Sequence, residues 1–344
     1  MAETVTRNRR PPTIEDVARL AGVSTATVSR SLNSPGRVRT QTREAVERAV
    51  VELGYTPNFV GQALASNRTN TIGAIIPTME NAIFARAIQA LQETLSPRNI
   101  TLLIATSQYS PSQEEEQIRA LLARGVDGAV LIGSCRSDSV YKLLTDRGLP
   151  FAILWSAPQE TEHLTIGFDN VAAAADVANR VMDKGHSRIA MISGLRADND
   201  RAQARVRGVV SALEARGLTL PPEHLIECRY SLDRGEMAAS QLLAGRNPPT
   251  AIICGNDVLA AGAMRAARKS GICIPNALSI TGFDDIELSR AVSPPLATVR
   301  VPHRRMGIHA AERLMQWIET GARPDSLELP TGFVERPSLA FRSS

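Results

Sequence analysis

The 344-residue chain is long enough for two or three domains with sizeable cores, and its formal net charge is +4. Residues 1–69 carry ten Lys and Arg against six Asp and Glu, whereas the remainder carries 29 of each sign. The excess positive charge therefore lies at the N-terminus, which indicates a polyanionic partner there. No apolar run spans a bilayer and the first residues lack a signal-peptide core, so we expect a cytoplasmic protein without a membrane segment.

The sequence contains no recognisable catalytic or metal-binding motif. The five histidines share no metal or triad spacing, and we find no P-loop, GxSxG or GxGxxG motif. The cysteines are unpaired in spacing, so we expect them to be reduced and mostly buried: Cys135, Cys228, Cys254 and Cys273. We therefore expect no enzymatic activity, no metal and no cofactor.

Residues 13–33 predict two short helices joined by a tight turn. Thr13 can cap the first helix, and Asp16 can complete a capping box. Gly22 can take the left-handed conformation that ends this helix, and Ser24 is a good N-cap for the next one. The apolar residues of the first helix share one helical face: Ile14, Val17, Ala18 and Ala21. The pattern indicates a helix-turn-helix.

The second helix is expected to begin near Thr25 and to present small, mostly uncharged residues on its outer face. Val28 and Leu32 would face inward, and small outer residues let a helix approach a partner closely. The major groove of DNA suits this face, because Arg30 can bond guanine, Thr25 a base edge, and Ala26 a thymine methyl. The alternative is a plain helical hairpin.

A third helix is predicted over residues 40–53 by its apolar face and by the stop signal Gly54. It would complete a small three-helix core. The preceding loop carries arginines suited to phosphate contacts, which fix register without reading sequence. The predicted phosphate contacts are Ser24, Thr27, Asn33, Arg37, Arg39 and Thr42.

Four segments are expected along the chain: a disordered basic arm at 1–12, the helix-turn-helix domain at 13–56, a hinge helix and linker at 57–69, and a larger domain at 70–344. The hinge helix is too short to be stable alone in water, so a partner must order it. Its bulky Leu64 suits a wedge at a minor-groove base step. The predicted minor-groove residues are Asn58, Gln62 and Leu64. The alternative is a linker helix that docks on the next domain.

The larger domain alternates short apolar strands with longer helical stretches, which predicts an α/β fold with parallel sheets. Two series of strands imply two lobes: 71–77, 101–106, 128–133 and 151–155, then 188–193, 226–230, 251–254 and 278–283. A strand at 298–302, a helix at about 305–320 and a strand pair around Leu327 and Phe333 follow. This return implies several crossovers between lobes and a cleft that opens on a hinge.

Ligands of open α/β sheets bind beyond the carboxyl ends of the strands, so the residues that follow each strand are candidates. An aromatic face with an arginine and several amides and carboxylates suits a polyhydroxylated molecule, and Arg205 would also bind a carboxylate. The predicted effector-binding residues are Thr78, Phe84, Arg205, Tyr230, Asn256 and Asp284, with Asp257 and Asp285 as further candidates. Each has a structural alternative as a helix cap, a turn residue or an ion-pair partner.

From about Thr13 to Phe341 the chain resembles the lactose/galactose repressor family of bacterial transcription regulators. Four stretches carry the resemblance: TIEDVARLAGVSTATVSRSLN, YTPNFVGQALAS, residues 169–194, and NDVLAAGAMRA with SITGFDD. The resemblance implies a helix-turn-helix head, a hinge helix that orders on DNA, and a dimerising two-lobed core similar to periplasmic sugar-binding proteins. The stretches TIGAIIPTMENAIFA and IGFDN resemble the branch that senses gluconate and related sugar acids.

The resemblance also assigns roles to residues. It places Thr25, Ala26 and Arg30 at base-reading positions and Leu64 at the minor-groove lever. Ala26 departs from the longer polar residue that many members use there. The effector contacts that it implies are Arg205, Tyr230, Asn256 and Asp284.

Two functions are compatible with this organisation. The first is a homodimeric regulator, most often a repressor, that binds double-stranded palindromic operator DNA and responds to a small polar metabolite, a sugar or sugar acid. The second is a two-lobed sugar-binding protein without a transcriptional role. The basic head and the lack of an export signal favour the first.

Overall fold

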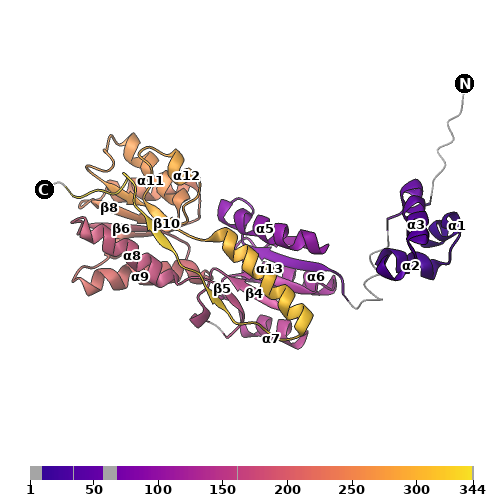
Figure 1. The fold of residues 1–344 in the computed structure, drawn as a ribbon. Helices are drawn as coiled ribbons and strands as arrows, with labels where there is room; N and C mark the ends of the chain where they lie inside the picture. Colours follow the sequence, from indigo (N-terminus) through magenta and orange to yellow (C-terminus); the bar gives the residue numbers. More distant parts are fainter. Residues whose placement is uncertain (1–9, 34, 57–67, 161, 343–344) are drawn as a thin grey trace, which may run out of the picture. The chain divides into compact units, whose positions relative to one another are not determined.

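The structure, a computed structural model, describes residues 10–33, 35–56, 68–160 and 162–342. The chain folds as two compact units, Met1–Thr69 and Asn70–Ser344, and each is considered by itself. They are coloured from indigo to yellow along the sequence in Figure 1. The predicted hinge residues Asn58, Gln62 and Leu64 and the side chain of Asn33 lie outside the described part.

The first unit has the three predicted helices: α1 (Ile14–Ala21), α2 (Thr25–Asn33) and α3 (Thr40–Leu53), with a 3-10 turn, η1 (Pro35–Arg37), between the last two. Asp16 Oδ2 accepts from the backbone N of Thr13 at 3.0 Å, as the capping box requires. Gly22 (φ 66°) and Gly54 (φ 63°) end α1 and α3 in the left-handed conformation. The helices enclose one small core: Val17, Ala18, Val28, Val46, Ala49 and Tyr55.

The first lobe of the second unit contains a six-stranded parallel sheet of order β11-β5-β4-β3-β1-β2. The strands are β1 (Thr71–Ile76), β2 (Thr101–Thr106), β3 (Gly128–Ile132), β4 (Phe151–Leu154), β5 (Thr165–Gly167) and β11 (Leu327–Glu328). β1 is buried along its whole length, because helices cover both faces of the sheet. β2 lies at the sheet edge and is only partly covered, and Ile104 is exposed.

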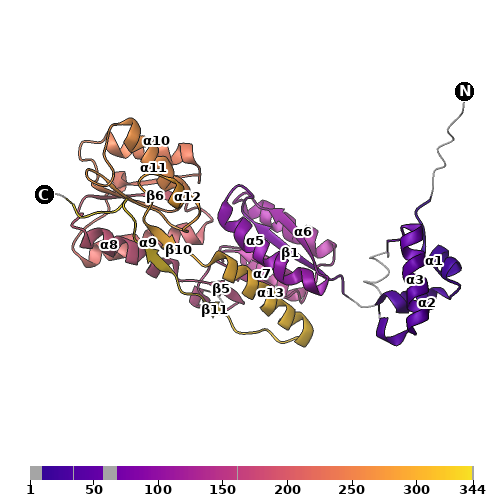
Figure 2. The same ribbon diagram turned by 45° about the horizontal axis from the view of Figure 1, so that its top comes forward.

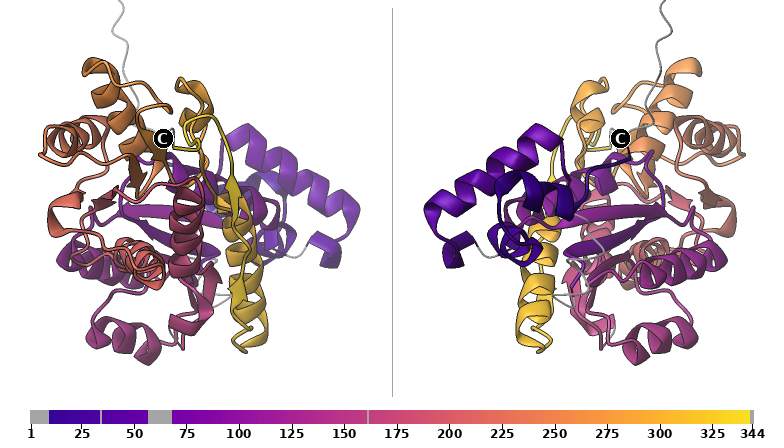
Figure 3. Two further views of the ribbon diagram at one scale, coloured as in Figure 1. Left: turned by 90° about the vertical axis from the view of Figure 1, so that its left-hand side faces the viewer. Right: turned by 90° about the vertical axis from the view of Figure 1, so that its right-hand side faces the viewer.

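Four helices cover this sheet: α5 (Ala82–Leu95), α6 (Pro111–Ala123), α7 (Asp138–Asp146) and α13 (His303–Thr320). The pair α5 and α13 packs on one face, and α6 and α7 pack on the other. Figure 3 shows α13, in yellow, standing beside the purple and magenta elements of this lobe. Short 3-10 turns, η2 (Ser96–Arg98) and η3 (Pro158–Glu160), lie in the connections.

The second lobe contains a four-stranded parallel sheet of order β7-β6-β8-β9. The strands are β6 (Ile189–Gly194), β7 (Leu225–Cys228), β8 (Ala251–Cys254) and β9 (Ser279–Thr281). The helices are α8 (Asn170–Asp183), α9 (Asp200–Ala215), α10 (Leu232–Leu243), α11 (Asp257–Lys269) and the short α12 (Leu288–Ala291), with η4 (Pro222–His224) before β7. In Figure 2, α10 and α11 lie on one side of β6, and α8 and α9 on the other.

Three segments connect the lobes: those between β5 and α8, between β10 (Thr298–Arg300) and α13, and between β11 and β12 (Gly332–Val334). The predicted strand pair around Leu327 and Phe333 is wrong. β11 pairs in parallel with β5, whereas β12 pairs antiparallel with β10. The two strands belong to different sheets because the chain crosses between lobes after residue 328.

Among the described residues, no helix has the length and apolar character needed to traverse a bilayer.

Candidate functional site

A cleft between the two lobes of the second unit brings together most of the predicted effector-binding residues. The first lobe contributes Asn81, Ile83, Phe84, Tyr109 and Trp155. The second lobe contributes Asn199, Arg201, Arg205, Tyr230, Asn256 and Asp284. The cleft contains about 320 Å³ of empty space, part of it open to solvent.

Arg205 lies at the base of the cleft and is 4% exposed. Its Nε donates to Asn170 Oδ1 at 3.0 Å, and its Nη1 donates to the backbone oxygen of Gly255 at 2.6 Å. The guanidinium stacks over the Phe283 ring at 3.8 Å. Its Nη2 is 3.8 Å from Asp284 Oδ1, which is too long for a hydrogen bond. Arg205 is therefore fixed in place with one nitrogen free to bind a ligand.

Asp284 faces this free nitrogen from the end of the segment after β9. It is 2% exposed, and its Oδ1 has no hydrogen-bond partner among the described residues. Burial raises its pKa to about 7, although Arg205 acts in the opposite direction. His303 Nε2 is 3.2 Å from the backbone oxygen of Asp284 and holds this segment. The arrangement leaves a buried acceptor that a ligand hydroxyl could satisfy.

Several cleft residues have strained backbones. Tyr109 (φ 60°), Trp155 (φ 65°) and Asp284 (φ 110°) are non-glycine residues in the left-handed region. Such conformations cost about 1–3 kcal/mol each and persist where the surroundings enforce them, often at ligand sites. Trp155 is also held by an edge-to-face contact with Phe84, with ring centroids 5.3 Å apart. The strain supports a role for this cleft in binding.

The structure places Phe84, Arg205, Tyr230, Asn256 and Asp284 in the cleft, as predicted. Thr78 is not among the cleft residues: its Oγ1 accepts from the backbone N of Glu80 at 3.1 Å and stabilises a turn. Asn81, three residues after Thr78, is the residue of this segment that lines the cleft, and it caps α5.

The two further candidates also lie outside the cleft lining. Asp257 is buried, and its Oδ1 and Oδ2 accept from Thr298 Oγ1 and the backbone N of Ile286. Asp285 forms ion pairs with Arg300 and Arg336. Both carboxylates therefore fix the chain after β9 and leave ligand contact to Asp284.

The sequence reasoning missed five polar or aromatic cleft residues: Asn81, Tyr109, Trp155, Asn199 and Arg201. Asn81 and Asn199 precede predicted helices and carry a recognisable N-cap signal. Trp155 was predicted as the last residue of the strand 151–155, whereas it directly follows the observed β4, so the rule for residues after a strand did not select it.

The lobes are bridged beside the cleft by Asp200, the first residue of α9. Its Oδ2 accepts from the backbone N of Ser134 at 2.6 Å, from Ser134 Oγ at 2.9 Å and from Ser156 Oγ at 3.1 Å. Its Oδ1 accepts from Arg201 Nη1 at 2.7 Å. Although burial acts to raise it, Arg201 and these hydrogen bonds hold the pKa of Asp200 below its ordinary value. The carboxylate thus connects the second lobe to the first.

We expect Asp200→Ala to open the cleft, because hydrogen bonds to a charged group contribute about 1.5–3 kcal/mol each. Trp155, one of two tryptophans, reports on this opening since it is buried in the cleft. In a Trp317→Phe background, Asp200→Ala should increase acrylamide quenching of Trp155 fluorescence. Asp198→Ala, at an exposed neighbour, is the control. Equal quenching in both variants would show that the bridge does not keep the lobes together.

The raised pKa of Asp284 predicts a pH dependence of stability. Between about pH 4 and pH 7 the folded protein keeps a proton that the unfolded chain, with an ordinary Asp pKa near 3.8, has lost. Unfolding releases this proton, so thermal stability should decrease as the pH rises through this window. Asp257, whose pKa burial also raises, contributes in the same direction. Asp284→Asn should reduce the slope, and an unchanged slope would contradict the assignment.

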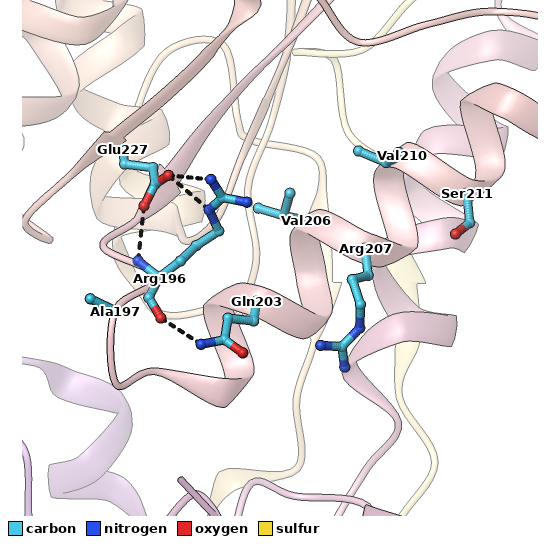
Figure 4. A pocket seen from close by; sticks show the side chains of 8 residues that line it. All are labelled: Arg196, Ala197, Gln203, Val206, Arg207, Val210, Ser211 and Glu227. Atoms are coloured by element: carbon cyan, nitrogen blue, oxygen red, sulfur yellow. Dashed lines mark hydrogen bonds and ion pairs between the residues drawn. The ribbon is translucent and has the colours of Figure 1, made fainter. Parts of the chain in front are cut away.

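A larger hollow lies on the outer side of α9 and β7, with about 1070 Å³ of empty space that is mostly open to solvent. Three of its polar residues bind one another: Glu227 pairs with Arg196, and Gln203 Nε2 donates to the backbone oxygen of Arg196. Figure 4 shows Arg207 and Val210 farther along the same helix. The inter-lobe cleft is smaller but has buried groups without partners, so we assign ligand binding to it.

In the first unit, α2 presents the predicted base-reading residues to solvent. Thr25, Ala26 and Arg30 are exposed, whereas Val28 on the opposite side is fully buried. Ser24 caps this helix, since its Oγ accepts from the backbone N of Thr27. Of the predicted phosphate contacts, Ser24, Arg37 and Arg39 are exposed, and Thr27 and Thr42 are partly exposed. The outer face of α2 is therefore available for a partner.

No group of three or more His, Cys, Asp and Glu side chains that could hold a metal occurs in the described residues. All four cysteines are free thiols. The expectation that they are mostly buried is wrong, because Cys135 and Cys273 are exposed. Both lie in connections between elements rather than in strands.

Two family models match the chain. Residues 13–58 match bacterial regulatory proteins of the lacI family, and residues 69–337 match the periplasmic binding proteins and sugar binding domain of the LacI family. The transcriptional repressor CytR of Escherichia coli K12 is 34% identical over 324 residues, which cover 92% of this chain and 94% of CytR.

Solved structures of transcription regulators are also similar to this chain. The lac repressor dimer bound to operator and the anti-inducer ONPF has a TM-score of 0.86 and 28% identity, and the match covers 96% of this chain and 100% of that one. The complex of the regulator CelR with cellobiose has a TM-score of 0.70 and 29% identity, with 95% and 99% covered. The chain is therefore similar to transcription regulators.

Proposed function

Because the chain belongs to the LacI family of bacterial regulatory proteins, we propose that it is a repressor that binds a palindromic operator as a homodimer and responds to a sugar or sugar acid. Residues 13–56 would bind DNA, residues 57–69 would form the hinge, and residues 70–344 would bind the effector and dimerise. Residues 1–12 would form a basic arm. The protein would act in the cytoplasm, where bacterial DNA is found.

DNA reading is assigned to the exposed face of α2. Arg30 can donate two hydrogen bonds to a guanine edge, Thr25 can bond a base edge, and Ala26 can contact a thymine methyl. The exposed Arg37 and Arg39, with Ser24, Thr27, Asn33 and Thr42, would contact phosphates. By resemblance, Asn58, Gln62 and Leu64 would contact the minor groove once DNA orders the hinge.

A homodimer is supported by the edge strand β2. Leu102 and Leu103 are only partly covered and Ile104 is 41% exposed, although all three are strongly apolar. An open apolar strand edge is rarely left unprotected in a monomer. A twofold dimer would place two recognition helices on the two half-sites of a palindrome. The lac repressor structure similar to this chain is a dimer on its operator.

The effector is assigned to the inter-lobe cleft, with Phe84, Arg205, Tyr230, Asn256 and Asp284 as contacts. Asp284 Oδ1 and Arg205 Nη2, which are 3.8 Å apart, can accept from and donate to one ligand hydroxyl. CelR, to which the chain is similar, was solved with cellobiose. A sugar or a gluconate-like sugar acid suits these groups.

Regulation would follow from linkage between the two sites. A ligand that binds one lobe arrangement more tightly shifts the population toward it, and the affinity for DNA changes by the same coupling free energy. The observation that carries the proposal is the pairing of an exposed, small-residue recognition helix with a strained cleft that contains unsatisfied polar groups.

The proposal is tested by selecting duplexes from a random library with the purified full chain and then measuring binding at physiological salt. We expect a palindromic sequence to be enriched and bound at least 1000-fold more tightly than bulk DNA, the lower range for specific binders. Sugars and sugar acids are then added to the complex. Binding of sugars without any DNA preference would instead support a two-lobed sugar-binding protein.

A further inference from the structure

The two edges of the second-lobe sheet differ in how they are covered. At the β9 edge the chain covers itself, since Ile280 N donates to the backbone oxygen of Ser338 and Thr281 forms a parallel bridge with Ala297. At the other edge, β7 pairs with β6 and with no further strand of the described residues. Outside this pairing, the backbone of residues 226–228 makes no backbone hydrogen bond within the part of the chain that the structure describes. The β7 edge therefore offers free donors and acceptors.

The hollow on the outer side of α9 and β7 lies beside this open edge. Side chains of β7 alternate: Leu225 packs toward the α8 and α9 side of the sheet, whereas Ile226 and Cys228 pack toward the α10 and α11 side. Across the hollow, α9 contributes the apolar Val206 and Val210 (Figure 4). An open strand edge beside a helix suits an extended peptide, because main-chain hydrogen bonds supply affinity and pockets for alternate side chains supply specificity.

The unpaired charge in the hollow is positive. Arg196 and Glu227 neutralise each other, with Arg196 Nη2 at 2.6 Å from Glu227 Oε1, and Glu227 is the one carboxylate among the lining residues. Arg207 is exposed and forms an ion pair with no carboxylate of the described residues. Arg229, which directly follows β7, is exposed as well. An acidic side chain of a partner therefore complements this part of the hollow.

Exposed acidic residues lie toward the opposite end of β7. The Arg196–Glu227 contact brings the loop before α9 beside the end of β7, so α9 runs antiparallel to this strand. Glu214, in the last turn of α9, and Glu223, in η4 before β7, therefore lie near the start of the strand. A segment with acidic residues only at the end beside Arg229 meets complementary charge, whereas a uniformly acidic segment meets repulsion.

We propose that β7 and α9 bind an extended segment of a partner protein as an added β-strand, with apolar side chains over Val206 and Val210 and an acidic side chain on Arg207. The added strand continues the second-lobe sheet at its open edge. This surface lies on the second lobe alone and uses no residue assigned to DNA or to the effector, so the inference goes beyond the proposed regulator.

The probe is a display library of short random peptides, selected on the full chain. We expect enrichment of peptides that alternate apolar residues and carry Asp or Glu toward one end. An enriched peptide is then synthesised and titrated against the full chain by fluorescence anisotropy. Its affinity should decrease as salt is raised, because exposed charges are screened. A selection that enriches no such peptide would overturn the proposal.

Hydrogen exchange distinguishes strand addition from attachment through charge alone. The bound peptide should slow amide exchange in residues 226–228, because the added strand binds their free backbone groups. Residues 101–106 of β2, the open edge of the first-lobe sheet, are the internal control and should be unchanged by the peptide. Slower exchange at β2 instead, or at neither edge, would contradict strand addition to β7. Protection of 226–228 that grows with protein concentration in the absence of peptide would show that a second copy occupies the edge, which also overturns the proposal.

Two variants test the side-chain contacts. Arg207→Glu places a negative charge opposite the acidic side chain, so peptide affinity should fall about tenfold or more while the Tm of the full chain changes little. Ser211→Trp, at an exposed position that lines the hollow, should block the peptide sterically. Arg268→Glu is the matched control, because Arg268 is an exposed arginine of α11 on the other side of the sheet. Unchanged peptide affinity in either Arg207→Glu or Ser211→Trp would show that the peptide binds elsewhere.

Discussion

Arg205→Ala is expected to abolish effector binding and to destabilise the second unit by about 3–5 kcal/mol, the usual result of removing one partner of a buried charge pair. The substitution removes the donors to Asn170 Oδ1 and the Gly255 carbonyl, and it leaves Asp284 facing an empty space. It also removes the group that stacks on Phe283. Urea unfolding of the full chain measures the stability, and titration with the effector measures binding.

The first unit should remain folded in this variant, because its hydrophobic core consists only of its own residues. Binding to random DNA should therefore persist, whereas the response to effector should be lost. Arg207→Ala is the matched control. Arg207 lies two residues farther along the same helix, is exposed, and lines the hollow on the outer side of α9 and β7. Arg205→Lys separates charge from geometry, since lysine keeps the charge but cannot reproduce the fork of hydrogen bonds. An effector response retained in Arg205→Ala would exclude this residue from the site.

The sequence predicted the elements that local patterns determine. Apolar periodicity and Gly54 placed α3 at residues 40–53, and continuous apolar runs placed β2 and β8 at their observed bounds. These signals are local because a helix end needs only a left-handed residue, and a short strand needs only a run of apolar residues.

The strands that sequence reasoning missed or mispaired are short. β5 has three residues and β11 has two, which is too few for a period to be read. Their places in the first sheet depend on where the chain crosses between lobes. That crossing is decided by the packing of α13 against α5 and the sheet, and no local pattern encodes it.

Sequence reasoning predicted only part of the candidate cleft, because local patterns do not show which segments meet in the folded chain. Arg205, Asn256 and Asp284 follow strands and obey a rule that can be applied to one strand at a time. Asn81 and Asn199 could be predicted as caps, but their convergence on one cleft requires both lobes to be placed.

Arg30→Ala is expected to weaken binding to the selected operator by about 1–3 kcal/mol and to relax the preference at one base position, because a bidentate contact to guanine is lost. Arg30 is exposed on α2, so its removal should not disturb the core around Val28. Repeating the duplex selection with the variant identifies the relaxed position, and titrations against operator and random duplexes give the two affinities.

Arg37→Ala is the control for Arg30→Ala. Arg37 is also an exposed arginine of the first unit, but it lies in the turn η1 and is assigned to phosphate. Its loss should weaken operator and random DNA by the same factor and reduce the salt dependence of binding. The ratio of operator affinity to random-DNA affinity therefore distinguishes base recognition from phosphate binding. This ratio should fall in Arg30→Ala and remain constant in Arg37→Ala. Equal losses on both duplexes in both variants would show that α2 does not read the bases.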